Sequence, residues 1–153
     1  MLNELEKLST EQQSQLLDAV PLITILVAGA DGNMDEAELA TAEKITKIRT
    51  YDSSIEVRPY FMRVGEIYTG RLNQLIAELP NDTAARTQAI SERLAALNPL
   101  LQAMDIGTTN QLLGDFRSFA RHVASASGGV LGFMTISGEE KEVVDLPMLL
   151  AAE

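Results

Sequence analysis

Three carboxylates stand close together between residues 31 and 38. Asp35 and Glu38 are three residues apart, which places them on one face of a helix, and Asp31 lies in the turn before them. Hard divalent cations such as Ca²⁺ and Mg²⁺ bind oxygen ligands of this kind. The spacing therefore predicts a divalent cation site at Asp31, Asp35 and Glu38.

The same residues also fit a role without an ion. Asp31 and Gly32 suit a turn, and Asp35 can accept hydrogen bonds from the free N–H groups at the start of a helix, with Glu38 closing a reciprocal capping box. The positive end of that helix favours both carboxylates. Capping alone and cation binding are thus two open interpretations of one pattern.

An EF-hand calcium loop is excluded at this position. Asp31, Asn33 and Asp35 alternate as the first ligands of such a loop do, but Glu36 stands where the loop needs glycine. The twelfth position is Ala42, so the bidentate glutamate is missing as well. Any cation site here has a different carboxylate geometry.

The elements that must position these acids are all predicted to be helices. Apolar spacing, capping residues and prolines predict helices over 9–30 (kinked or divided at Pro21), 35–50, 59–79, 82–97, 112–123 and 137–146. No segment alternates with the period of a strand. We expect an all-α fold, a single-domain bundle of about six to eight helices over residues 1–153.

The acidic turn has a partial second copy near the carboxyl end. When Met34 is aligned with Ile136, Glu38 falls on Glu140, and both lie one turn into a helix that follows a short turn. The second copy has Phe133 where the first has Asp31. The sequence thus predicts a pseudo-repeated helix-turn-helix unit, with Glu140 as the equivalent acid and stronger cation chemistry in the first copy.

Residues 27–38 read Val-Ala-Gly-Ala-Asp-Gly-Asn-Met-Asp-Glu-Ala-Glu. This resembles the A-D-G-x-x-D-x-x-E signature of the TerB-like proteins, all-helical bacterial domains linked to tellurite resistance, and the turn before Glu140 looks similar to a second family-like turn. The resemblance covers about a dozen residues and does not extend over residues 50–104. It implies a role in stress-response or membrane-associated assemblies, with Asp31, Asp35 and Glu38 at the acidic motif positions.

Composition excludes several classes of function. Twelve Lys and Arg against 22 Asp and Glu give a net charge of −10, which repels nucleic acid. The absence of cysteine removes thiolate chemistry, and one histidine is too few for an all-protein zinc site. The most apolar run, 19–30, is too short to span a bilayer, and no basic secretory start precedes it. We expect a cytoplasmic protein without a transmembrane segment.

No catalytic constellation is recognisable. His122 has no serine at a spacing that marks a nucleophile, so it is expected to be a structural or surface residue. Gly128, Gly129 and Gly132 match neither the Walker nor the dinucleotide pattern. An enzyme that uses carboxylates as acid and base would need a deep pocket, which the sequence does not predict.

Two functional interpretations follow. The first is a non-enzymatic, TerB-like accessory domain that binds a divalent cation, an unidentified protein partner, or both. The second is a structural interaction domain, a homodimer included, whose acidic turns only cap helices and whose exposed apolar face contacts the partner.

Overall fold

The computed structural model describes residues 2–30, 39–40, 42–44, 46–47, 56–126 and 143–150. These residues form helices joined by turns, and no strand occurs among them. The predicted all-α class is therefore confirmed. In the same part of the chain, no helix has both the length and the apolar character needed to cross a membrane.

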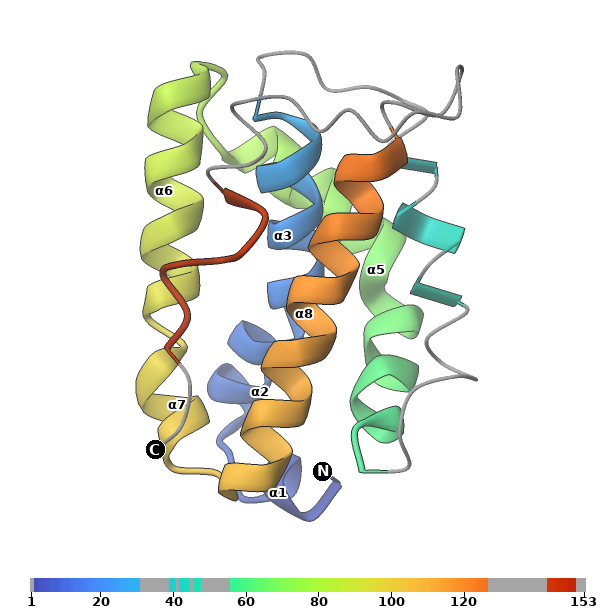
Figure 1. Cartoon of the computed structure of the whole chain (residues 1–153), viewed down its shortest axis with the longest axis vertical. Helices are drawn as coiled ribbons and strands as arrows, with labels where there is room; N and C mark the ends of the chain where they lie inside the picture. Colours follow the sequence, from blue (N-terminus) through green and yellow to red (C-terminus); the bar gives the residue numbers. More distant parts are fainter. Residues whose placement is uncertain are drawn as a thin grey trace.

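An apolar helix lies at the centre of the bundle. All ten residues of α3 (Ala19–Ala28) are buried. It packs against α5 (Arg58–Glu78), α6 (Thr83–Ala95) and α8 (Ile106–Ala126), which surround it in Figure 1. A helix that is apolar on every side needs neighbours on every side. The sequence of α3 thus fixes its place at the centre.

Two short helices precede α3. They are α1 (Leu2–Glu6) and α2 (Thr10–Leu17), and they lie at the end of the bundle that also holds the amino terminus (Figure 1). Ser9 caps α2 in a reciprocal box: Gln12 N donates to Ser9 Oγ at 3.1 Å, and Ser9 N donates to Gln12 Oε1 at 2.9 Å. The predicted capping box is confirmed.

The predicted division of the first long helix also occurs, but it lies before Pro21. The chain bends at Asp18, which ends α2 and begins α3. Pro21 is then the third residue of α3, where the first turn has no intrahelical acceptor for a backbone N–H. The proline therefore marks the start of a helix here.

In the remaining helices, the residues predicted to form an apolar face are the ones that are buried. The buried face of α5 comprises Tyr60, Phe61, Val64, Tyr68, Leu72 and Leu75. Asp82 caps α6 by accepting from Ala85 N at 2.9 Å, and Asn98 and Pro99 begin a new short helix, α7 (Asn98–Gln102). α8 carries Leu112, Phe116, Phe119 and Val123 into the core.

The predicted final helix is wrong for residues 144–146. Val143 is helical, but the following residues form two consecutive turns, in which Leu146 N donates to Val143 O at 2.9 Å and Leu149 N donates to Leu146 O at 3.0 Å. Leu146 has φ 49°, in the left-handed region. Pro147 cannot continue a helix, and side chains from α7 and α8 bind the backbone of these residues instead.

Candidate functional site

The predicted cation ligands Asp31, Asp35, Glu38 and Glu140 lie outside the described residues. The pseudo-repeat of the two acidic turns lies outside them as well. The structure does describe what flanks the first turn: α3 ends at Ala28, and helical residues occur again at 39–40, 42–44 and 46–47. The residues on both sides of this turn are therefore placed in the fold.

The backbone just before the acidic turn is bound to α6. Arg86 Nη2 donates to Gly29 O at 2.9 Å, and Arg86 Nη1 donates to Asn81 O at 3.3 Å. A cation at the carboxyl end of a helix binds the free carbonyls there and is favoured by the helix dipole. A Cβ on Gly29 would lie 2.8 Å from Arg86 Nη2, so the glycine permits this contact. Gly29 is thereby held two residues before Asp31.

Helical residues after the acidic turn lie against α5. Leu39 and Glu43 line an open cavity of about 260 Å³ together with residues of α5, among them Tyr68 and Leu72. Thr24 Oγ1 donates to Val20 O at 3.0 Å and is hydrogen-bonded to Tyr68 Oη at 2.8 Å, where either hydroxyl can donate. Burial first, and then the charge of Glu43, raises the pKa of Tyr68 to about 12, although its bond to Thr24 opposes the rise.

A second group of polar side chains surrounds Asp18 at the junction of α2 and α3. Arg71 donates to both carboxylate oxygens of Asp18, from Nε at 2.9 Å and from Nη2 at 2.7 Å. These bonds raise the pKa of Arg71, while burial lowers it. Cavities of about 260 Å³ and 280 Å³ lie on either side of Asp18, one lined by Arg93 and Leu97 and the other by Ile67 and Arg71.

We expect this ion pair to stabilise the fold measurably. Its side chains are 31% and 18% exposed for Arg71 and Asp18, and its two parallel bonds fix the geometry. A double-mutant cycle with Asp18→Asn and Arg71→Gln, measured by urea unfolding, should give a coupling energy of about 1–2 kcal/mol.

The pair Arg121–Asp145 is the matched control. It has the same residue types but a single contact of 3.0 Å and exposures of 57% and 69%. Its coupling should stay below about 0.5 kcal/mol, as is usual for exposed pairs. Equal coupling energies in the two cycles would show that burial and bidentate geometry do not matter at Asp18.

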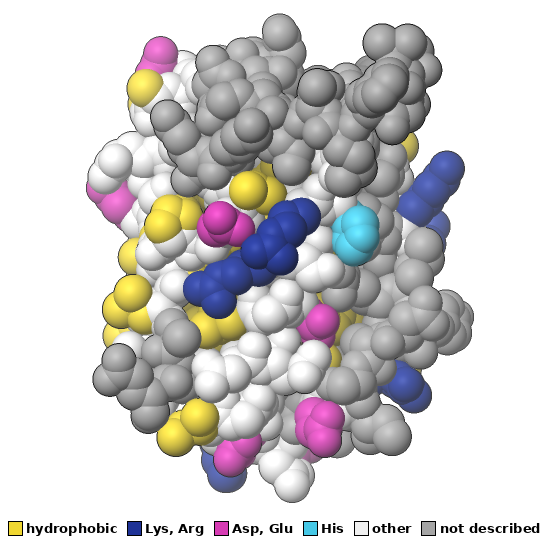
Figure 2. Space-filling model, viewed as in Figure 1, with side chains coloured by type: hydrophobic (Ala, Val, Ile, Leu, Met, Phe, Trp, Pro, Cys, Tyr) yellow, Lys and Arg dark blue, Asp and Glu magenta, His cyan; other side chains and the backbone are white. Residues whose placement is uncertain are grey.

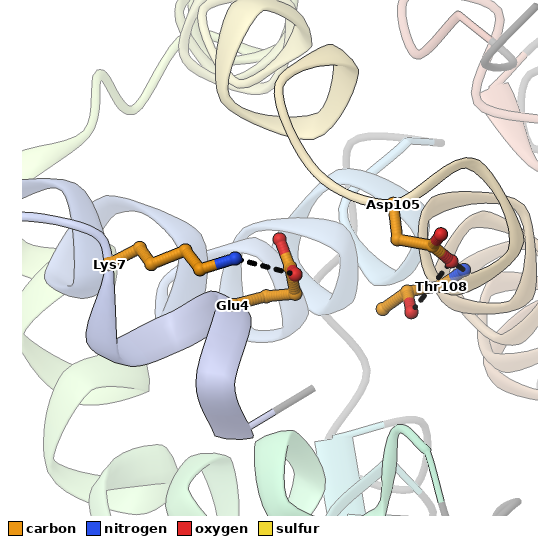
Figure 3. Close-up of polar contacts among 4 residues, drawn as sticks. All are labelled: Glu4, Lys7, Asp105 and Thr108. Atoms are coloured by element: carbon orange, nitrogen blue, oxygen red, sulfur yellow. Dashed lines mark hydrogen bonds and ion pairs between the residues drawn. The ribbon is translucent and has the colours of Figure 1, made fainter.

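Glu4 and Asp105 lie at the end of the bundle that holds α1 and the start of α8. The carboxylate of each binds a residue three positions further along the chain (Figure 3). Glu4 pairs with Lys7 at 3.4 Å. Asp105 accepts from Thr108 N at 3.0 Å and from Thr108 Oγ1 at 3.3 Å, which caps α8. Each acid thus has a structural role, and no group of three His, Cys, Asp or Glu side chains among the described residues is arranged to hold a metal.

Residues 143–150, which we call the C-terminal segment, cross the face of the bundle shown at the front of Figure 1. Val144, Leu146 and Leu149 are buried in the core. Asn98 Nδ2 donates to Met148 O at 2.9 Å, and Leu150 N donates to Asn98 Oδ1 at 3.0 Å. The segment is therefore held by apolar anchors and by a paired amide contact from α7.

Two arginines of α8 complete this contact. Arg117 Nε donates to Asp145 O and Arg117 Nη2 donates to Leu149 O, both at 3.0 Å, and Arg121 Nη2 contacts Asp145 Oδ1 at 3.0 Å. Figure 2 shows basic side chains across the middle of this face, next to an acidic one. Sequence reasoning missed both arginines because the partners of Arg117 are backbone atoms 28 and 32 residues away and that of Arg121 is a side chain 24 residues away, which no local pattern reports.

His122 is exposed on α8, as expected for a surface histidine. It is not one of the residues described above that contact the C-terminal segment.

Compared with known proteins, the chain matches no protein-family model, no curated protein and no solved structure.

Proposed function

We propose that this chain is a non-enzymatic accessory domain that resembles TerB-like stress-response proteins and binds a divalent cation through its acidic turn. Asp31, Asp35 and Glu38 supply the oxygen ligands, and Glu140 is the equivalent acid of the second copy. Ca²⁺ and Mg²⁺ are the ions whose preference for carboxylate oxygens fits these ligands. A protein partner that recognises the loaded turn is the second part of the proposal.

The observation that carries the proposal is the support of the turn on its amino-terminal side. α3 is buried along its whole length, and Arg86 ties its end to α6 at Gly29. A scaffold that is already ordered favours ion binding, because less conformational entropy is lost when the ligands close around the ion. The net charge of −10 adds long-range attraction for a cation.

The interaction-domain alternative receives less support from the described surface. This alternative predicts a large exposed apolar patch on the surface of the domain. The large hydrophobic side chains that are exposed in the described part of the chain are Met62, Ile106 and Leu150, at 52%, 52% and 53%, and they come from three separate elements. Scattered apolar side chains of this kind are normal on a soluble surface.

The cation should stabilise the folded chain. After chelator treatment, thermal unfolding and titration calorimetry with Ca²⁺, Mg²⁺, Mn²⁺ and Zn²⁺ should show one ion with a selective effect. At ~100 times its dissociation constant that ion adds about 2.7 kcal/mol to the free energy of unfolding. Asp31→Asn and Asp35→Asn should remove the effect.

Glu66→Gln provides the matched control, because Glu66 is an exposed acid on α5 and its replacement changes the net charge by the same amount. This variant should keep the full ion effect. If no ion stabilises the natural chain, or if Glu66→Gln lowers the effect as much as Asp31→Asn does, the acids act as helix caps and the cation site is refuted.

A further inference from the structure

One cavity lies where the junction of α2 and α3 faces the end of α6. We call it the Arg93 cavity; its volume is about 260 Å³, and it is lined by Gln15, Asp18, Leu22, Arg93, Ala96 and Leu97. The first three residues are spaced by three and four positions, and Ala96 and Leu97 follow Arg93 by the same intervals. Residues at these intervals share one face of a helix. Because α3 packs against α6, the two faces meet.

Two side-chain donors of the Arg93 cavity have no partner in the described part of the chain. Arg93 and Gln15 are exposed, and neither forms a hydrogen bond or an ion pair there. Each of the other described arginines interacts with another residue. A guanidinium and an amide that both face a cavity can bind a carboxylate, the guanidinium through two parallel hydrogen bonds.

Asp18 brings acceptor sites to the same cavity. Its two carboxylate oxygens each accept one hydrogen bond from Arg71, and its side chain is 18% exposed. A carboxylate oxygen can accept two hydrogen bonds, so one acceptor site remains on each oxygen among the contacts of the described residues. The Arg93 cavity therefore offers an anion-binding group together with an acceptor for a cation or an N–H group.

The remaining lining is apolar, and the cavity is small. Leu22, Ala96 and Leu97 present carbon atoms to it. A volume of about 260 Å³ lies just below the range of roughly 300–1,000 Å³ in which drug-sized ligands bind. A matching ligand is thus a small molecule that carries a carboxylate, a nitrogen donor and a short aliphatic chain.

We propose that the Arg93 cavity binds a free aliphatic amino acid. The carboxylate of the ligand pairs with Arg93 and Gln15, its ammonium group donates to Asp18, and its side chain packs against Leu22 and Leu97. Phosphate fits less well, because its second negative charge would lie near Asp18 and it has no apolar part for the leucines. This site goes beyond the proposed cation binding and uses none of the same ligands.

Titration of the full chain with L-leucine tests the proposal. Amide chemical shifts should change at the α2–α3 junction and in the last turn of α6, with a dissociation constant on the order of 1 mM for so small a ligand. Arg93→Gln should raise this constant at least about tenfold, the loss expected when a hydrogen bond between charged groups is removed.

Two further variants separate the site from a general effect of charge. Arg121→Gln removes the same charge from α8, and Arg121 does not line the cavity, so this variant should bind leucine as the natural chain does. Ala96→Phe keeps the charge and fills the cavity, so it should weaken binding as strongly as Arg93→Gln. Arg93 and Ala96 are exposed, and circular dichroism checks that both variants stay folded.

Ligand analogues identify each contact on the natural chain, without any substitution. Leucinamide lacks the carboxylate for Arg93, and 4-methylpentanoate lacks the ammonium group for Asp18. Both should bind at least about tenfold more weakly than leucine. Inorganic phosphate should bind more weakly as well.

Three results would overturn the proposal: no shifts with leucine well above 1 mM, equal binding by Arg93→Gln, or binding of 4-methylpentanoate or phosphate as tight as that of leucine. Without leucine binding, Arg93 only stabilises the carboxyl end of α6 through the helix dipole. The titrations contain no divalent cation, so their failure is distinct from failure of the proposed function.

Discussion

Phe116→Ala is expected to lower the free energy of unfolding by about 3–5 kcal/mol. Phe116 is fully buried on α8, and its ring meets that of Tyr60 edge-to-face with centroids 5.8 Å apart. The substitution removes the buried ring surface and leaves a cavity between α5 and α8 that the neighbouring helices fill only in part. Urea unfolding followed by circular dichroism measures the loss.

Met62→Ala is the control for this prediction. Met62 is also a large apolar side chain, but it is 52% exposed on α5. Its truncation should change stability by no more than about 0.5 kcal/mol. Since the whole fold of such a domain is stable by only about 5–15 kcal/mol, the contrast should be plain. Similar losses in the two variants would show that Phe116 is not in the core.

The second large effect is a loss of stability at alkaline pH through the buried tyrosines. Burial raises the pKa of Tyr68 from 10.0 to about 12 and that of Tyr60 well above 10.0, with the charge of Asp18 adding to the rise at Tyr60. Tyr60 Oη donates to Leu16 O at 2.7 Å, so ionisation would also break that bond.

The sign follows from the protons bound in each state. Above pH 10 the unfolded chain releases its tyrosine protons while the folded chain keeps them, so the folded chain binds more protons and its stability falls as pH rises. The contribution of Tyr68 is fully present below pH 10 and is lost as the pH approaches 12. A rise in pKa of this size corresponds to roughly 3 kcal/mol.

Urea unfolding at pH 9, 10 and 11, compared between the natural chain and Tyr68→Phe, measures this effect. The variant should be about 1 kcal/mol less stable at pH 9, where one hydrogen bond to Thr24 is missing, and the difference should shrink as the pH rises. The comparison cancels the titration of lysines. A difference that stays constant over this range would mean that Tyr68 ionises in the folded chain as readily as in the unfolded one.

Local patterns were sufficient for most of the secondary structure. The capping box of Ser9 and Gln12, the cap at Asp82 and the apolar stripe from Phe61 to Leu75 all depend on neighbours within one or a few turns, which the sequence presents directly. α1 was not predicted, because its five residues are too few to show a period, although Leu5 is fully buried.

The predictions that failed or shifted involve competition between local and long-range contacts. Pro21 indicated a break, but the break falls at Asp18, where Arg71, 53 residues away, binds both carboxylate oxygens. The capping pattern before Val143 favoured a helix through Leu146. Asn98 and Arg117 instead bind the backbone of the C-terminal segment. They lie on α7 and α8, far from the segment in sequence, so the residues around Val143 do not predict these contacts.

The candidate cation site was predicted from residue types and their spacing, and Asp31, Asp35, Glu38 and Glu140 remain predicted ligands. Only the tertiary structure could add Arg86 at Gly29, since a contact between residues 57 positions apart depends on how α3 and α6 pack. The sequence determined the all-α class, the helix starts at Ser9 and Asp82 and the central position of α3, because these follow from periodicity and capping within a few turns. The tertiary structure decided which distant side chains bind which backbone groups, since that requires helices already packed against one another.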